Sequence, residues 1–85
     1  MRVRKQQVSY EIIFHIFSNT DLTEAECQVI ALLVEGNSPE EIVSIRKVQK
    51  NSLQKQFNSI YAKLRAVGFT INDRSDLVRL VKNLL

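Results

Sequence analysis

RKVQKNSLQKQFNSIYAKLR, residues 46–65, carries six Lys or Arg and no Asp or Glu. The whole chain of 85 residues has nine acids and a formal charge of only +3, yet no acid falls between Ile42 and Asn72. Apolar side chains recur within the stretch at the spacing of one helical face: Leu53, Phe57, Ile60, Tyr61 and Leu64. The stretch therefore predicts a helix over residues 52–66 with one apolar face and one face cleared of acids.

A capping box marks the start of an earlier helix. Thr23 and Glu26 have the spacing at which each side chain can accept the other's backbone N–H. Gly36 is suited to end that helix, because glycine readily takes the left-handed conformation past a helix end. These signals predict a helix over residues 24–35 whose inward side chains are Val29, Leu32 and Leu33.

Similar signals delimit two more helices. Residues 38–41, SPEE, repeat the capping box with a proline at the first helical position, and predict a short helix that ends near Arg46. Gly68 ends the helix of residues 52–66, and Asp73 caps a last helix over residues 74–84. That last helix has an apolar stripe: Leu77, Leu80, Val81 and Leu84.

The first helix, predicted over residues 3–18, has an unusually wide apolar surface. Its apolar residues cover roughly two-thirds of the helical wheel: Val8, Tyr10, Ile12, Ile13, Phe14, Ile16 and Phe17. It could be a lid on the core, or a membrane-surface helix aided by Arg2, Arg4 and Lys5. We expect instead that one stripe packs on the domain and the other contacts a second protein. The partner face is expected to comprise Ile12, Ile13, Ile16 and Phe17.

Composition indicates one small all-α domain without enzymatic chemistry. Two Gly and one Pro leave little room for the turns of an all-β fold. Cys27 is the only cysteine, which fits a reducing cytoplasm, and the longest apolar run, residues 29–34, is too short to span a membrane. His15 is the only histidine, and Cys27 has no evident base. We therefore expect no metal, no cofactor, no catalytic residue and no membrane insertion.

The missing acids indicate a nucleic-acid partner. If the apolar stripe faces inward, the exposed side of the helix carries Asn51, Gln54, Lys55 and Asn58, side chains that can hydrogen-bond base edges in the major groove of duplex DNA. Other basic residues, such as Lys47, Lys50 and Lys63, would pair with phosphates. A short helix, a tight turn and a polar-faced helix are typical of a helix-turn-helix.

The chain also resembles the LuxR-type, or GerE-type, DNA-binding domain over residues 22–81. The matching residues follow that family's order and spacing: Leu22, Thr23, Glu26, Val29, Leu32, Leu33, Glu35, Gly36, Ser38, Glu41, Ile42, Val48, Ser52, Leu53, Ile60, Lys63, Leu64, Arg74, Ser75, Leu77 and Val78. The resemblance implies a four-helix domain over residues 22–85 that regulates bacterial transcription, preceded by an extra amphipathic helix and linker over residues 1–21.

The same resemblance assigns roles to individual residues. It implies base contacts by Gln54, Lys55 and Asn58, and places Lys50, Asn51 and Ser52 near the DNA backbone. It also implies a homodimer whose interface lies on the last helix: Leu77, Leu80, Val81 and Leu84.

Several positions depart from the family pattern. Lys47 replaces a common turn glycine, and Gln49 replaces the usual serine before the recognition helix. Arg46 occupies a usual leucine position, so we expect Ile45 to turn inward in its place. The connection after Leu64 is several residues longer than the family's.

Two other functions remain open from the sequence. A protein-interaction module could keep the fold and use its first and last helices to sequester or bridge a partner regulator. A promoter-recognition domain like those of sigma factors shares the helix-turn-helix. We favour a stand-alone regulator over an excised output domain, because a well-formed helix follows Met1.

Overall fold

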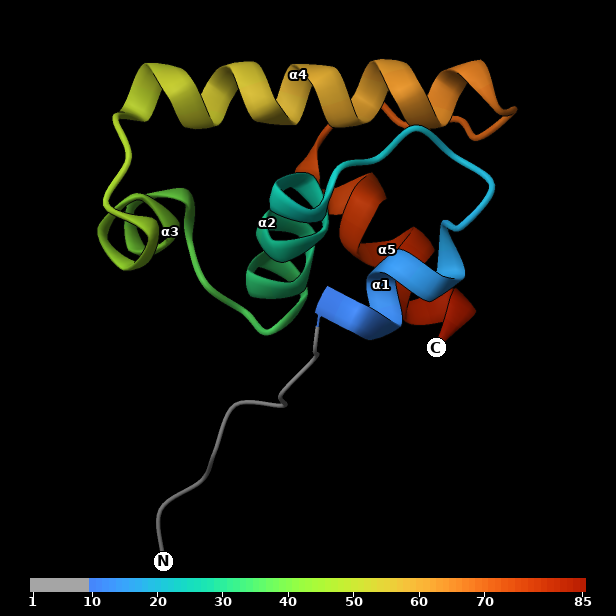
Figure 1. Cartoon of the computed structure of the whole chain (residues 1–85), viewed down its shortest axis with the longest axis horizontal. Coiled ribbons are helices and arrows are strands. Elements are labelled where there is room, and N and C mark those ends of the chain that lie inside the picture. Colours follow the sequence, from blue (N-terminus) through green and yellow to red (C-terminus); the bar gives the residue numbers. More distant parts are fainter. Residues whose placement is uncertain (1–9) are drawn as a thin grey trace, which may run out of the picture.

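The computed structural model describes residues 10–85, and over these residues the protein has five helices and no strand. The helices are α1 (Tyr10–Ile16), α2 (Glu24–Val34), α3 (Pro39–Arg46), α4 (Lys50–Ala66) and α5 (Arg74–Leu84). Figure 1 shows α4 along one side of the molecule, α3 near its N-terminal end, and the other three helices below it. The all-α class is confirmed, while the predicted helical residues 3–9 lie outside the described part of the chain.

The predicted caps are present and set the helix starts. Thr23 Oγ1 accepts the Glu26 N–H at 3.2 Å, and Glu26 Oε1 accepts the Thr23 N–H at 2.9 Å. Ser38 and Glu41 form the same reciprocal pair at 3.2 and 2.8 Å, and Asp73 caps α5. Each cap satisfies N–H groups that have no partner within the helix. Local sequence signals therefore fixed these boundaries to within about a residue.

α2 is the central helix, and the other four all pack against it. Most of its circumference is buried: Glu26, Cys27, Val29, Ile30, Ala31, Leu33 and Val34. A helix that is apolar nearly all round belongs in the middle of a fold. α4 contributes the stripe predicted from its spacing, and every member is buried: Leu53, Phe57, Ile60, Tyr61 and Leu64.

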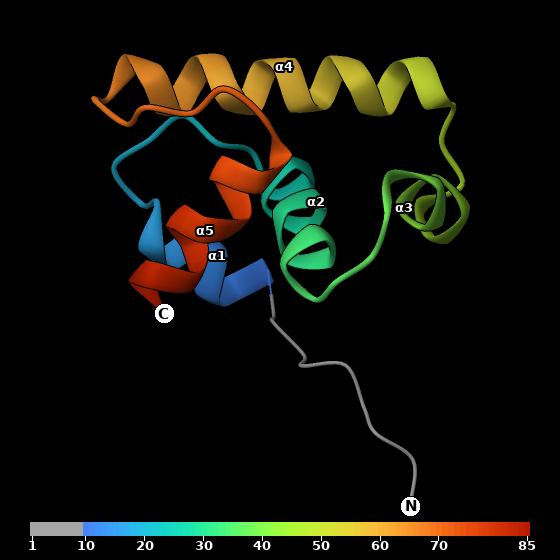
Figure 2. The ribbon, with the colours of Figure 1, turned by 180° about the vertical axis from the view of Figure 1, so that it is seen from behind.

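The connection between α4 and α5 folds back along α4. Gly68 has φ +104°, a conformation that residues with a Cβ rarely adopt, and it reverses the chain after α4. Phe69 then packs edge-on against Phe17 of the segment after α1, with ring centroids 6.0 Å apart, and Ile71 is buried. Figure 2 shows this connection running beside α4, so that α5 begins below the middle of that helix.

The first helix packs differently from the prediction. Ile13 and Phe17 are one turn apart and belong to the same buried core as α2, so the prediction that they face a second protein is wrong. Ile16 is partly buried against that core. Ile12 and Phe14, on either side of Ile13, are 46% and 50% exposed. The wide apolar surface of this segment is thus partly core and partly exposed, and the segment shares one core with residues 22–85.

The last helix also places part of its stripe in the core. Leu77 and Val81 are fully buried within the chain, so the prediction that they form a dimer interface is wrong. Leu80 packs partly on the core, whereas Leu84 is 45% exposed and Leu85 is 52% exposed. The large apolar side chains that this end of the chain leaves exposed are therefore those at the C-terminal end of α5.

Burial distinguishes two neighbouring isoleucines of α1. We expect Ile13→Glu to destabilise the fold by more than about 3 kcal/mol, because it places a carboxylate in an apolar core. Ile12→Glu should change stability by less than about 1 kcal/mol, because that side chain is half exposed. Urea denaturation followed by circular dichroism measures both. Equal losses would contradict the described packing of α1.

Candidate nucleic-acid interface

The connection between α3 and α4 is tight and includes an unusual lysine conformation. Lys47 has φ 55° and ψ 45°, and within residues 10–85 it is the only non-glycine residue with positive φ. The N–H groups of Lys47 and Val48 both bond to the Val43 carbonyl, and Val48 packs partly on the core. A left-handed lysine costs roughly 1 kcal/mol relative to glycine.

The start of α4 lacks the features that stabilise the other helix starts. Gln49 is in the N-cap position, and its side chain caps no N–H group. The first turn of α4 holds Lys50 and no acid, whereas α2, α3 and α5 each have a side-chain cap and an acid in the first turn. Carboxylates normally favour the positive end of the helix dipole. The start of α4 therefore presents N–H groups and a lysine with no carboxylate of its own.

The exposed face of α4 carries the residues predicted to read bases. Gln54, Lys55 and Asn58 are all exposed, and Asn51 is exposed one turn earlier. The Gln54 amide nitrogen donates to Asn58 Oδ1 at 3.2 Å, which links two of these side chains across one turn. Figure 1 shows α4 at the edge of the molecule. Because the stripe on its opposite face is buried in the core, this polar face lies on the surface.

Charge is strongly separated within the described residues. Residues 46–65 carry six bases and no acid, whereas the remaining residues of 10–85 carry nine acids and three bases. The acids cluster at the first turns of the other helices and in α1 and the loops. α4 therefore carries positive charge and no carboxylate of its own, although Glu26 and Asp73 of neighbouring elements lie beside it.

Lys63 is held by a carboxylate rather than being free for a phosphate. Its Nζ lies 2.7 Å from Glu26 Oε1, with the Glu26 side chain only 7% exposed. A contact of Lys63 with the DNA backbone, which the sequence predicted, would compete with this ion pair, so the ammonium is left out of the candidate interface. The pair joins the start of α2 to the C-terminal half of α4, and so fixes how α4 lies on the central helix.

The environment of Glu26 lowers the pKa of its carboxyl below the ordinary value of 4.5. Burial acts to raise that pKa. Hydrogen bonds from Lys63, Ser59 and the Thr23 N–H, together with the Lys63 charge, outweigh burial and stabilise the carboxylate.

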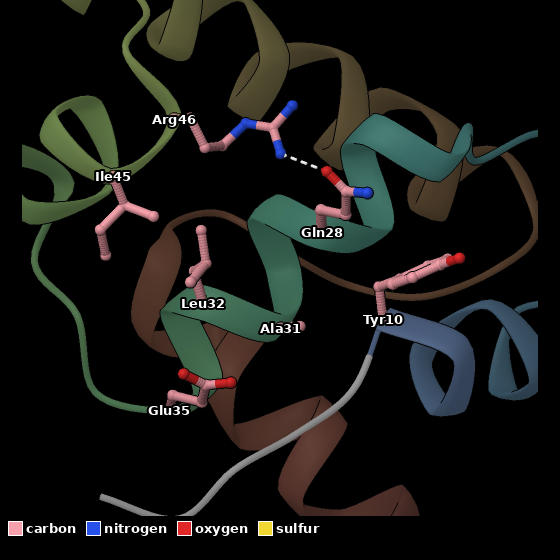
Figure 3. A pocket seen from close by; sticks show the side chains of 7 residues that line it. All are labelled: Tyr10, Gln28, Ala31, Leu32, Glu35, Ile45 and Arg46. Atoms are coloured by element: carbon pink, nitrogen blue, oxygen red, sulfur yellow. Dashed lines mark hydrogen bonds between the residues drawn. The ribbon is translucent and has the colours of Figure 1, made fainter.

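Arg46 is turned toward α2 and away from the exposed face of α4. Its Nη1 donates to Gln28 Oε1 at 2.6 Å, as Figure 3 shows. Ile45 is 53% exposed and lines a pocket of about 540 Å³ beside Leu32, so the expected inward turn of Ile45 is wrong. Arg46 is partly buried and lines the same pocket. It is therefore no part of the candidate interface.

Two basic residues that the sequence analysis did not select lie beside the polar face. Arg65 and Arg74 line a polar cleft together with Gln54 and Asn58. Arg74 comes from α5, and only the reversal at Gly68 brings it next to α4. No sequence signal local to residues 46–65 could have indicated it.

Comparisons with known protein families, with characterised proteins and with solved structures found no match to this chain. Within residues 10–85, no three His, Cys, Asp or Glu side chains group as metal ligands do. None of the helices in that range has the length and apolar character needed to cross a membrane. The candidate interface is thus defined by the residues and geometry of the chain itself.

The buried pair predicts a pH-dependent effect on stability. We expect Glu26→Gln to lower the free energy of unfolding by about 2 kcal/mol at pH 7, because it leaves the Lys63 ammonium without its carboxylate. The lowered pKa means that the carboxylate stabilises the fold above pH 4.5 and that this contribution is lost as the pH falls through the folded-state value. The stability deficit of Glu26→Gln should therefore shrink as the pH is lowered below 4.5.

Urea denaturation at pH 7 and pH 3 measures this difference. Glu40→Gln is the control, because Glu40 is an exposed first-turn acid of α3 without such a partner. It should change stability by less than about 1 kcal/mol at either pH. A Glu26→Gln deficit that stays constant over the whole acid range in which the protein is folded would show that packing, not charge, is responsible.

Proposed function

We propose that this chain is a bacterial transcription regulator of the LuxR type, which acts in the cytoplasm and binds duplex DNA as a homodimer. In this proposal α3, residues 47–49 and α4 form a helix-turn-helix with α4 as the recognition helix. One observation carries the proposal: α4 begins without a cap or an acid and exposes an acid-free polar face, unlike α2, α3 and α5. A helix under selection for stability alone has no need to give up these features.

Base contacts are assigned to Gln54, Lys55 and Asn58. A helix of this width fits the major groove of B-DNA, which is about 12 Å wide. Amide side chains such as Gln54 and Asn58 can bond adenine in two places, and Lys55 can donate to guanine. Their exposure on one side of α4 supports simultaneous contact with neighbouring base pairs.

Phosphate contacts are assigned to Lys47, Lys50, Asn51 and Ser52. All four side chains are exposed, and they lie at the connection or in the first turn of α4. Backbone N–H groups at a helix start bind phosphate oxygens, and the helix dipole favours the anion there. The missing cap at Gln49 supports this role, because no side chain competes for those N–H groups.

The helix start allows stability and binding to be separated. We expect Gln49→Asp to raise the free energy of unfolding by about 1 kcal/mol, because aspartate caps the helix and favours its dipole. The same change should weaken DNA binding roughly tenfold, because the new carboxylate repels phosphate. Gln49→Ser should add a cap without charge, so it should also stabilise the fold. It should weaken DNA binding less than Gln49→Asp does, because its hydroxyl competes for an N–H group but adds no repulsive charge.

Fluorescence anisotropy with a duplex selected from a randomised pool measures affinity, and urea denaturation measures stability. Lys55→Ala is the positive control for base reading, with an expected loss of about 1–3 kcal/mol on the selected duplex. Unchanged affinity in both Gln49→Asp and Lys55→Ala would rule out docking through α4.

The homodimer is assigned to the C-terminal end of α5. Leu84 and Leu85 are about half exposed, and Leu80 is partly exposed beside them. Figure 1 places this end of the molecule away from α4, so a contact there leaves the polar face of α4 free. A two-fold contact would use the same patch on both subunits and set the spacing of two half-sites.

We expect Leu84→Asp to give a folded monomer with weaker binding to a duplex that carries two half-sites, because it places a charge at the centre of the exposed patch. Lys82→Gln, two residues earlier and outside the patch, is the control and should stay dimeric. Sedimentation equilibrium at about 50 μM, with and without DNA, measures association. A wild-type protein that is monomeric under both conditions would exclude the homodimer.

A protein-interaction module is the second candidate function. The exposed Ile12 and Phe14 on α1 favour it, because two large apolar side chains on a short helix are available to a partner regulator. The DNA titrations distinguish the two functions. A folded protein that binds no duplex at low salt would favour the interaction module.

A further inference from the structure

A polar cleft of about 490 Å³ lies between α4 and the start of α5. Gln54, Asn58 and Arg65 line it from α4, and Asp73 and Arg74 line it from the other side. Gln54 and Asn58 also belong to the exposed face of α4, so the cleft directly borders the residues proposed to read bases. The two walls of the cleft come from distant parts of the sequence: residues 54–65 form one and residues 72–75 the other.

Each arginine of the cleft is held by a separate contact. Arg65 donates from Nε to the Tyr61 carbonyl one turn earlier, at 3.3 Å. The guanidinium carbon of Arg74 lies 5.8 Å from the centre of the Phe57 ring, in a cation–π contact. Both side chains are exposed, and these contacts occupy only the Nε of one and a face of the other. The terminal N–H groups remain able to donate, and less conformational freedom is lost when they bind.

One acid also lines the cleft, and its carboxylate is already in use. Asp73 Oδ1 accepts the Asp76 N–H at 2.9 Å as the cap of α5. Two guanidinium groups therefore line the cleft with one carboxylate, that of Asp73, which caps α5. The cleft therefore keeps an excess of positive charge next to planar hydrogen-bond donors, the combination that binds phosphate oxygens.

We propose that this cleft binds phosphate groups of the DNA backbone, with Arg65 and Arg74 as the donors, on the strand that flanks the bases facing Gln54 and Asn58. The inference rests on the proposed function, because it assumes that α4 occupies the major groove. Backbone contacts fix the register of a protein on DNA without reading sequence. In this proposal α5 both completes the core and contributes a contact to the DNA strand beside the recognition helix.

Salt dependence tests these phosphate contacts. Binding releases counterions, and each phosphate contact contributes about 0.9 to the slope of log K against log salt concentration. Arg65→Gln and Arg74→Gln should each lower that slope by about 0.9 and weaken binding roughly three- to tenfold, on selected and random duplexes alike. Lys82→Gln, which removes one positive charge from the far end of α5, is the matched control and should leave the slope unchanged.

Asp73→Asn tests the same cleft in the opposite direction. Asparagine caps a helix about as well as aspartate, so α5 should keep its start. Removal of the carboxylate should tighten DNA binding about threefold, because a repulsive charge beside the phosphate is gone. Loss of fold cannot mimic tighter binding, so this variant separates electrostatics from misfolding. Thermal melting of all four variants provides the stability comparison.

Inorganic phosphate distinguishes the DNA backbone from a free anion as the ligand. In 1H–15N correlation spectra, the Arg65 and Arg74 Nε–H signals should shift when duplex DNA is added. Shifts with inorganic phosphate, combined with unaltered DNA binding of Arg74→Gln, would overturn the assignment to DNA. If Lys55→Ala binds DNA weakly but both arginine variants keep the wild-type slope of log K against log salt concentration, the phosphate contacts by Arg65 and Arg74 are overturned and the proposed function stands. No binding of any duplex by the wild-type protein would overturn both.

Discussion

The carboxylate of Glu26 accepts hydrogen bonds from the Thr23 N–H at the start of α2 and from the Lys63 ammonium on α4. One buried group therefore both begins the central helix and fixes the lengthwise position of α4 upon it. A buried carboxylate without these partners would be strongly unfavourable, so the arrangement is constrained as a unit. The polar face of α4 owes its outward orientation to this tie and to the apolar stripe on the opposite face.

The region around the start of α4 gives up local stability at several neighbouring points. Lys47 adopts a left-handed conformation that glycine would adopt more easily, and Gln49 leaves the first turn of α4 uncapped. Lys50 places a positive charge at the positive end of the helix dipole. Each feature has a modest cost, and each presents a positive charge or an N–H donor to solvent. Their concentration at one helix start supports a binding role there, because α2, α3 and α5 are each capped by a side chain.

The position of each helix in the fold determines which surface it can offer to a partner. α2 is buried by four neighbours, so its own surface offers little to a partner. α4 lies at one side of the molecule (Figure 1). One of its faces is exposed, and it carries no acid. In our proposal a polyanion therefore meets α4 first, and the start of α5 beside it contributes Arg74 to the same surface.

The sequence by itself determined the local elements. Capping boxes and glycines act within a few residues, so they predicted the starts of α2, α3 and α5 and the ends of α2 and α4 almost to the residue. α4 has no side-chain cap, and it begins at Lys50, two residues before the predicted start. The spacing of Leu53 to Leu64 likewise predicted which face of α4 is buried, because a helix that packs on one side must place its apolar residues there. The exposure of Gln54, Lys55 and Asn58 followed from the same periodicity.

Only the tertiary structure decided which of the side chains that the sequence predicted to be exposed are paired or buried within the chain. Lys63 resembled any other basic residue of its stretch until α2 supplied Glu26, which lies 37 positions away in the sequence. Ile13, Phe17, Leu77 and Val81 could have faced a partner by periodicity alone, but α2 and its neighbours cover them. Arg74 joined the surface of α4 only through the reversal at Gly68. Periodicity defines the faces of a single helix, whereas the neighbour that covers each face depends on how the whole chain packs.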